Sequence, residues 1–116
     1  MRKLDVKKIT ETIRRMTVEV NTDLPQDVEQ ALVEGRAKEE SPFGQYCLDQ
    51  ILANAKLARC EKQAMCQDTG TMVVYLNIGQ DLHLVGGDLT EAVNEGIRLG
   101  YDEGYLRRSM VEEPVF

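Results

Sequence analysis

One short segment of the sequence gathers several side chains that can do chemistry. Residues 66–70 read Cys-Gln-Asp-Thr-Gly and supply a thiol, an amide, a carboxylate and a hydroxyl before the glycine. A thiolate binds soft metals and iron–sulfur clusters, and an amide can both donate and accept hydrogen bonds. Glycine permits backbone conformations closed to other residues, so a ligand can approach closely. The same composition also fits a plain turn that follows a buried packing thiol, and the spacing alone leaves both interpretations open.

The remaining cysteines and the single histidine are weaker candidates for a site. Cys47 lies on the apolar stripe of an expected helix, and we interpret it as a core thiol. Cys60 lies among charged residues near the end of that helix, and we expect a partly exposed free thiol. The spacings of thirteen and six residues between the three cysteines match no common zinc ribbon or ferredoxin pattern. His83, between two leucines, is interpreted as a surface or packing residue.

Three helices are expected ahead of this segment. Apolar spacing predicts the first from Leu4 to about Val20. Asp23 can cap a second helix, with Pro25 in its first turn. Ser41, followed by proline, marks the start of a third helix with a hydroxyl cap. Its broad apolar face predicts that it is the most buried of the three.

A hairpin and a last helix are expected after the segment. Residues 72–78 are almost continuously apolar and rich in strand formers, which predicts a well-buried strand. After a turn at residues 79–81, residues 82–85 can return as a second strand. The sequence therefore predicts an α+β fold, mainly helical with about four helices and a small hairpin or sheet after residues 66–70.

The last helix carries a regular series of glycines. Asp88 can cap this helix, with Glu91 three residues later. Gly96, Gly100 and Gly104 then recur at intervals of four. Glycine inside a helix costs about 1 kcal/mol relative to alanine. Three glycines on one face therefore predict that another backbone packs closely there.

Composition limits the classes of function. The chain has 116 residues, close to the commonest size for one domain, and a formal net charge of −6 at pH 7. That charge argues against nucleic acid, since phosphate binding needs a basic face. No apolar run is long enough to span a bilayer, and the basic start lacks the apolar core of a signal peptide. An odd cysteine count without a secretory signal argues against a disulfide framework and favours the cytoplasm.

Several segments together resemble one enzyme family. Cys-Gln-Asp-Thr-Gly followed by a hydrophobic stretch resembles the cluster-binding signature of class I iron–sulfur fumarate hydratases and of L-tartrate dehydratase alpha subunits. The resemblance continues through residues 78–81, the glycine pair at 86–87, residues 94–101 and residues 104–109. It runs from about the third expected helix to Phe116, and the first two helices fit the helical start of the family.

The resemblance implies roles for individual residues. Cys66 would be one of three cysteine ligands to a [4Fe–4S] cluster. Gln67 and Asp68 would help to bind the dicarboxylate substrate. Arg107 would pair with a substrate carboxylate, for which the planar guanidinium is well suited. Arg108 stands beside it, and the sequence leaves the choice between the two arginines open.

The resemblance also implies what the chain lacks. Alpha regions of the family are longer, so residues 1–116 are expected to be the truncated amino-terminal part of an iron–sulfur hydro-lyase alpha domain. The catalytic base and the other two ligands would lie outside it, and no catalytic residue is expected within it. Implied partners are the rest of the alpha region and a beta subunit or domain, in a homo- or hetero-oligomer.

The expected reaction is the reversible hydration of fumarate to malate, with L-tartrate dehydration as the alternative. An inactive structural fragment, or a split-subunit module that needs a partner, is the alternative of another class. This inactive or split-subunit alternative rests on the chemistry of the cluster, because one thiolate cannot hold a [4Fe–4S] cluster.

Overall fold

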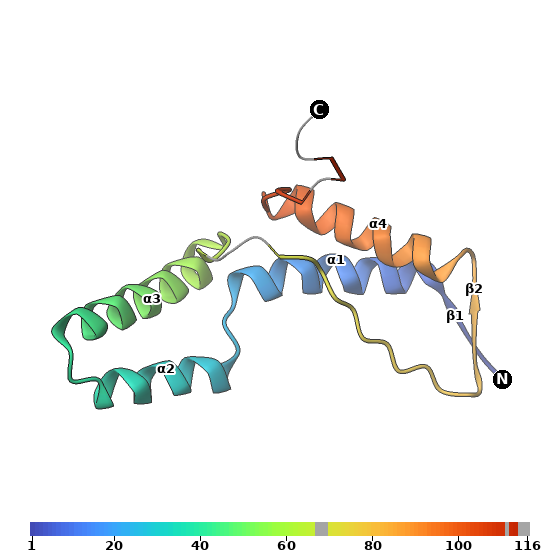
Figure 1. Cartoon of the computed structure of the whole chain (residues 1–116). Coiled ribbons are helices and arrows are strands. Elements are labelled where there is room, and N and C mark those ends of the chain that lie inside the picture. The colour runs from blue at the N-terminus through green and yellow to red at the C-terminus, as the bar shows by residue number, and fades with distance from the viewer. Residues whose placement is uncertain (67–69, 111, 114–116) are drawn as a thin grey trace. The chain divides into compact units, whose positions relative to one another are not determined.

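Helices make up most of the described chain, as the apolar spacing predicts. The computed structural model describes residues 1–66, 70–110 and 112–113 (Figure 1). In chain order, the elements within these residues are β1 (Arg2–Asp5), α1 (Val6–Thr22), α2 (Gln26–Lys38), α3 (Pro42–Glu61), β2 (Leu82–Val85) and α4 (Leu89–Glu103). The four helices and the small sheet confirm the mainly helical α+β class. None of the helices in the described part of the chain is long and apolar enough to cross a membrane.

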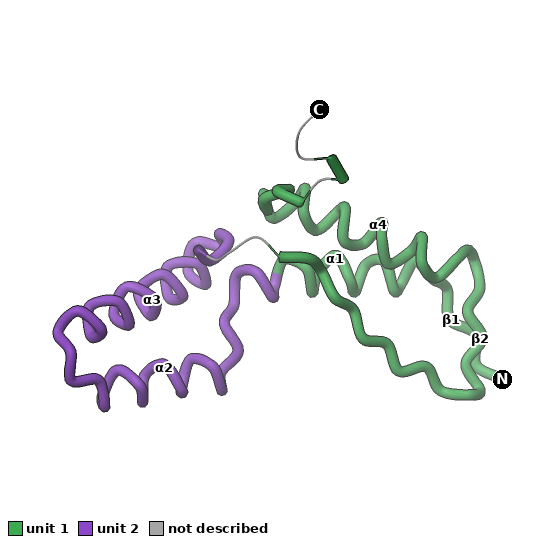
Figure 2. The backbone as a smooth tube through the Cα atoms, viewed as in Figure 1, with its two compact units in different colours: residues 1–18, 68–116 green, residues 19–67 purple. Residues whose placement is uncertain are grey.

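The chain divides into two compact units (Figure 2). Unit 1 comprises Met1–Val18 and Asp68–Phe116, and unit 2 comprises Glu19–Gln67. Residues 66–70 therefore belong partly to each unit, with Cys66 in unit 2 and Gly70 in unit 1.

The sheet of unit 1 differs from the expected hairpin. β2 pairs with β1, in parallel, with Arg2 opposite Leu82 and Asp5 opposite Val85. Leu4 consequently lies in β1, and the first helix begins at Val6 instead. The start of the chain thus supplies the pairing edge that the hairpin prediction assigned to residues 72–78.

Residues 72–78 form no strand, so the prediction of a well-buried strand is wrong. The expected turn does form, since the Leu82 N–H donates to the Gly79 carbonyl at 3.1 Å. The chain before it has no regular secondary structure, and several of its apolar side chains are exposed, namely Val73, Tyr75, Leu76 and Ile78. An apolar run signals a preference for burial, but it does not specify a partner strand.

Two glycines of α4 bring that helix against α1 within unit 1. A Cβ built on Gly96 would lie 2.7 Å from the Thr10 carbonyl oxygen, and one on Gly100 would lie 2.6 Å from the Thr17 Cβ. The Thr10 hydroxyl also donates to the Ala92 carbonyl at 2.8 Å. The prediction of close backbone packing is confirmed at these two positions. Gly104 is different, because it ends α4 and its neighbours are Gly100 and Leu106 of its own segment.

The helix caps follow the sequence at two starts and depart from it at one. Ser41 caps α3 by accepting from the Gly44 N–H at 3.4 Å, and Asp88 caps α4 by accepting from the Glu91 N–H at 3.0 Å. The expected Asp23 cap of α2 is wrong, since Pro25 occupies the N-cap position without a side-chain hydrogen bond. The Asp23 carboxylate instead forms ion pairs with Arg59 and Lys62 at the end of α3.

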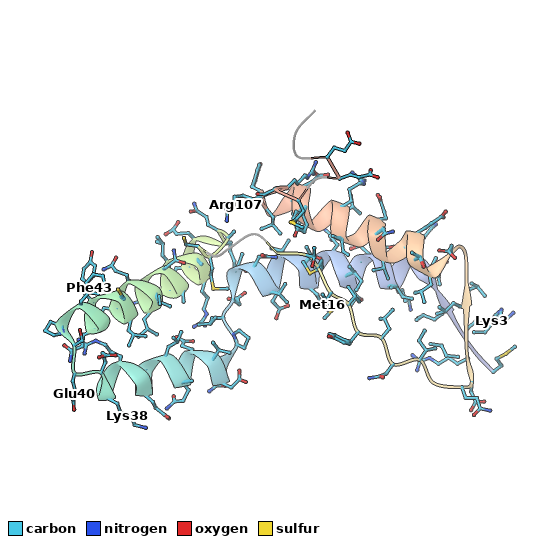
Figure 3. The ribbon with its side chains drawn as sticks, in the orientation of Figure 1. Lys3, Met16, Lys38, Glu40, Phe43 and Arg107 are labelled. Carbon is cyan, nitrogen blue, oxygen red and sulfur yellow. The ribbon has the colours of Figure 1, made fainter. Side chains whose placement is uncertain are left out.

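Unit 2 has a small core. α2 and α3 contact each other and are joined by an ion pair between Arg36 and Asp49 at 2.7 Å. The expectation that α3 is the most buried of the first three helices is wrong. Its buried residues are Ala55 and Ala58, whereas Phe43 at its start is 75% exposed (Figure 3). Small side chains bury little surface, so packing on one side leaves the larger apolar groups of α3 in solvent.

Candidate active site

Cys66 follows a sharp chain reversal at the end of α3. Lys62 has a left-handed backbone with φ of +53°, which turns the chain away from the helix axis. The Gln63 N–H then donates to the Ala58 carbonyl at 3.1 Å, a bond typical of helix ends that close on a left-handed residue. This geometry sends residues 63–66 back along α3.

Two hydrogen bonds hold the returning chain where the motif begins. The Met65 N–H donates to the Asn21 carbonyl near the end of α1 at 2.8 Å. The Cys66 N–H donates to Asn54 Oδ1, from the interior of α3, also at 2.8 Å. Cys66 itself is exposed, so its interpretation as a buried packing thiol is wrong. The backbone of this cysteine is fixed while its side chain remains accessible.

An ion-pair group reinforces the same corner of unit 2. Arg59 donates to Glu29 at 2.8 Å and to the Leu24 carbonyl at 3.3 Å, and it pairs with Asp23 at 3.5 Å. Lys62 reaches Asp23 at 3.6 Å. Hydrogen bonding to Glu29 raises the pKa of Arg59 further, so its charge is constant at any working pH. These contacts tie the end of α3 to the connection between α1 and α2.

The other residues of the motif divide between undescribed and described positions. Gln67, Asp68 and Thr69 lie outside the described residues. Gly70 and Thr71 line a hollow of about 370 Å³ in unit 1. Met72 adjoins them, and the remaining walls come from α4 and the segment after it, and consist of Ile97, Arg98, Tyr101, Arg107, Arg108, Ser109 and Met110. The last residue of the motif, the residues directly after it and the arginine pair at 107–108 thus share one pocket.

Arg107, labelled in Figure 3, belongs to the segment after α4 and lines this hollow. Tyr105 turns the chain with a φ of +51°. Leu106 is then buried, and its N–H donates to the Tyr101 carbonyl at 3.0 Å. The buried leucine therefore anchors the backbone next to the arginine.

Arg98 and Arg108, which line the hollow, form ion pairs with carboxylates of α4. Arg98 contacts Glu95 at 2.6 Å and Asp102 at 3.1 Å, and Arg108 forms an ion pair with the same Asp102. Hydrogen bonding from Arg98 lowers the pKa of Glu95, which keeps that carboxylate ionised. Asp102 therefore offsets positive charge contributed by both Arg98 and Arg108.

The cysteines do not form a complete ligand set within the described structure. All three are free thiols, and no group of three or more His, Cys, Asp or Glu residues that could hold a metal occurs in residues 1–66, 70–110 and 112–113. Cys47 and Cys60 both lie in α3, where thirteen residues correspond to about 20 Å along the axis. They cannot share one cluster. The donor chemistry and exposure of Cys66 fit one ligand position of an iron–sulfur cluster.

The weaker candidates agree with the sequence interpretation only in part. Cys60 is exposed, as expected for a free thiol, whereas Cys47 is only half-buried, so its interpretation as a core thiol is not confirmed. His83 is exposed in β2, opposite Lys3 of β1, which confirms the surface interpretation.

Comparison with known proteins identifies the family. The family model described as "Fumarate hydratase (Fumerase)" matches residues 10–116. The chain belongs to the fumarate hydratase family.

Relatives of this family member include tartrate dehydratase subunits. A Methanocaldococcus jannaschii protein assigned as an L(+)-tartrate dehydratase alpha subunit is 32% identical over 105 residues, covering 90% of this chain and 37% of that protein. The L(+)-tartrate dehydratase alpha subunit of Escherichia coli K12 is 26% identical over 107 residues, covering 92% of this chain and 35% of the subunit. The chain thus spans little more than a third of the length of these relatives.

Sequence reasoning missed some residues of the site in this fumarate hydratase family member. Asn54 was not recognised, because nothing local links it to a cysteine twelve residues later. The one feature of the sequence that could have indicated Asn54 is a polar amide in a stretch of α3 that is otherwise rich in alanine and leucine. Tyr101 and Ile97 of the pocket wall were likewise assigned no role, since aromatic and aliphatic residues on a helix usually indicate packing.

Proposed function

We propose that this chain is the amino-terminal segment of a [4Fe–4S]-dependent hydro-lyase that hydrates fumarate to malate reversibly. L-Tartrate dehydration is the alternative for the same site, and the names of the relatives favour it. The observation that carries the proposal is the hollow of unit 1, in which Gly70 and Thr71 share a wall with Arg107. It combines the end of the motif with a guanidinium.

The hollow suits a small dianion. Its volume of about 370 Å³ is at the small end of the range for ligand pockets. Arg107 would pair with one substrate carboxylate through two parallel hydrogen bonds. Arg108, which also lines the hollow and pairs with Asp102, is the alternative for this role. Gln67 and Asp68 would complete the substrate contacts from the motif.

Cys66 would provide one thiolate ligand of the cluster. When bound, a cluster with an open iron position supplies a Lewis acid that polarises a substrate oxygen. The contribution of this chain is the exposed thiol and the fixed backbone behind it. The remaining ligands and the base would come from the rest of the alpha region, with a beta subunit or domain as partner. A cytoplasmic location stays a prediction.

A structural module without activity is the second candidate. It rests on cluster chemistry, because the one thiolate proposed as a ligand cannot hold a [4Fe–4S] cluster, which needs three or four. We expect this segment by itself to assemble no stable cluster and to turn over no substrate. A stoichiometric cluster with fumarate turnover in the isolated segment would contradict that expectation.

The proposal is tested in the full-length protein reconstituted anaerobically with iron and sulfide. Cys66→Ser is expected to abolish cluster assembly, and Cys60→Ser, at the other exposed cysteine, is expected to leave it unchanged. Turnover of fumarate, malate and tartrate by the unmodified protein then distinguishes the two substrates. A full cluster in Cys66→Ser protein would refute the ligand assignment.

Arg107 has its own test. Arg107→Lys keeps the charge and loses the planar fork, so kcat/KM is expected to fall about 10- to 100-fold, the range for a lost hydrogen bond to a charged group. Arg15→Lys, at an exposed site of α1, is the matched control and should behave like the unmodified protein. An Arg107→Lys variant as active as the control would remove Arg107 from the site.

A further inference from the structure

We infer that Asn54 is a positioning residue for Cys66: its side chain fixes the backbone from which the cluster-binding thiol projects. The Cys66 N–H donates to Asn54 Oδ1 at 2.8 Å, although the two residues are twelve positions apart. Asn54 can act in this way only if Cys66 is a ligand, so the inference rests on the function proposed above.

The geometry of α3 explains why Asn54 occupies this position. From Asn54 to Glu61, the last residue of α3, the helix rises about 10 Å. The chain reverses at Lys62, and the next four residues can span about 13 Å when extended. The returning segment therefore reaches back to about the level of Asn54 and no farther. A polar side chain two turns before the helix end is where an anchor for Cys66 is needed.

The two anchors of this segment differ in their dependence on side chains. Met65 is held by the carbonyl of Asn21, which is backbone. The Cys66 N–H is held by the amide side chain of Asn54. Substitution of Asn54 therefore releases Cys66 selectively while the Met65 contact remains. Substitution at this one position therefore tests how much the Asn54 amide contributes to the positioning of Cys66.

An amide also suits the chemistry better than a carboxylate. Both groups accept the Cys66 N–H, but a carboxylate would add negative charge beside a thiolate ligand. Like charges at close range disfavour the ionised form of each other. A neutral acceptor holds the backbone without opposing the charge of the ligand. This explains why a half-buried asparagine, in place of aspartate or glutamate, makes the contact.

The experiment measures cluster retention in the full-length reconstituted protein. Three variants are compared with the unmodified protein: Asn54→Ala, Asn54→Asp and Asn94→Ala. Asn94 is an exposed asparagine in the interior of α4 and controls for the gain in helix propensity on substitution by alanine. The readouts are the rate of iron loss to a chelator under anaerobic conditions and the melting temperature of the cluster-free protein.

The expected result is a change in iron loss without a matching change in stability. Asn54→Ala should lose iron about fivefold faster, the factor that corresponds to one neutral hydrogen bond of about 1 kcal/mol. Asn54→Asp keeps the acceptor and should stay within about twofold of the unmodified protein, since the added charge only partly offsets the retained bond. The melting temperature of cluster-free Asn54→Ala should stay within a few degrees of the Asn94→Ala control.

Two outcomes would overturn the inference. One is an Asn54→Ala variant that loses iron no faster than Asn94→Ala. The other is faster loss accompanied by a larger fall in the cluster-free melting temperature, because Asn54 would then only stabilise unit 2. Cys66→Ser separates these failures from failure of the proposed function. If Cys66→Ser also retains its cluster, the ligand assignment itself is wrong; if it loses the cluster while Asn54→Ala does not, only the role of Asn54 is refuted.

Discussion

Replacing Gly100 by alanine tests the close packing of α4 on α1. A Cβ at this position would lie 2.6 Å from the Thr17 Cβ and 2.9 Å from the Arg14 carbonyl oxygen. Ordinary contacts of a Cβ lie at 3.4–4 Å, so α1 and α4 would have to separate. A side chain can rotate out of the way, but a helix carbonyl and a Cβ cannot. The substitution therefore acts on the distance between the two helices.

The expected net effect is a loss of stability of about 1–2 kcal/mol. Alanine gains about 1 kcal/mol over glycine in helix propensity. Overpacking a tight contact costs about 1–3 kcal/mol, and the rigid neighbours place Gly100 at the upper end of that range. Gly35 in α2 is the matched control, because nothing lies within 4 Å of its added Cβ. Gly35→Ala should raise stability by about 1 kcal/mol.

Urea unfolding followed by circular dichroism at 222 nm measures both variants. Each 1 kcal/mol shifts the midpoint by about 0.3–1 M for a small protein. Gly100→Ala should lower the midpoint and Gly35→Ala should raise it, and amide exchange assigns each change to α4 or α2. Equal stabilisation by the two substitutions would refute the close approach of α1 and α4. Because Ile97 and Tyr101 of α4 line the hollow, Gly100→Ala should also weaken substrate binding.

Three further predictions concern local charge and backbone. Lys62→Gly should raise the melting temperature, because the left-handed backbone costs a non-glycine residue about 1–2 kcal/mol. The greater entropy of glycine in the unfolded chain offsets part of this gain, and an unchanged or lower melting temperature would contradict the prediction. Asp102→Asn should release Arg98 and Arg108 from the carboxylate that they share. The affinity for a dicarboxylate, measured by calorimetry, should then rise up to about fivefold, and weaker binding would argue against an anion pocket. The hydrogen bond with Arg98 lowers the pKa of Glu95, so this contact stabilises the fold at neutral pH and is lost as the pH falls below 4.5 through the lowered pKa. Glu95→Gln should therefore make stability fall less steeply with decreasing pH in the acid range, and an unchanged pH dependence would refute this coupling.

The candidate site was predicted from the sequence in part. Residues 66–70 stand out by residue type, and the exposure of Cys66 agrees with a ligand. The proposed pairing of Arg107 with the end of the motif could not be derived from spacing. It depends on α4 and the segment after it lying beside Gly70 and Thr71. Nearly forty residues separate these groups, and a local pattern contains no information about contacts over that distance.

The fold, like the candidate site, was predicted from the sequence only in part. Apolar periodicity and capping residues are local, so the sequence by itself determined the helices, the caps at Ser41 and Asp88, and the tight helix contact at Gly96 and Gly100. Only the tertiary structure decided which strand pairs with β2 and which apolar segments remain exposed. Strand pairing and burial need a partner from elsewhere in the chain. The residues of one segment cannot specify that partner.

For Cys66, the sequence determined the type of chemistry and the tertiary structure decided its support. The motif identifies a thiol followed by an amide and a carboxylate. The reversal at Lys62 and the return of the chain along α3 then bring the Cys66 N–H to Asn54. A hydrogen bond has a directional requirement that only the folded backbone can meet. That is why the residue that holds the cysteine emerged from the structure while the cysteine itself was found in the sequence.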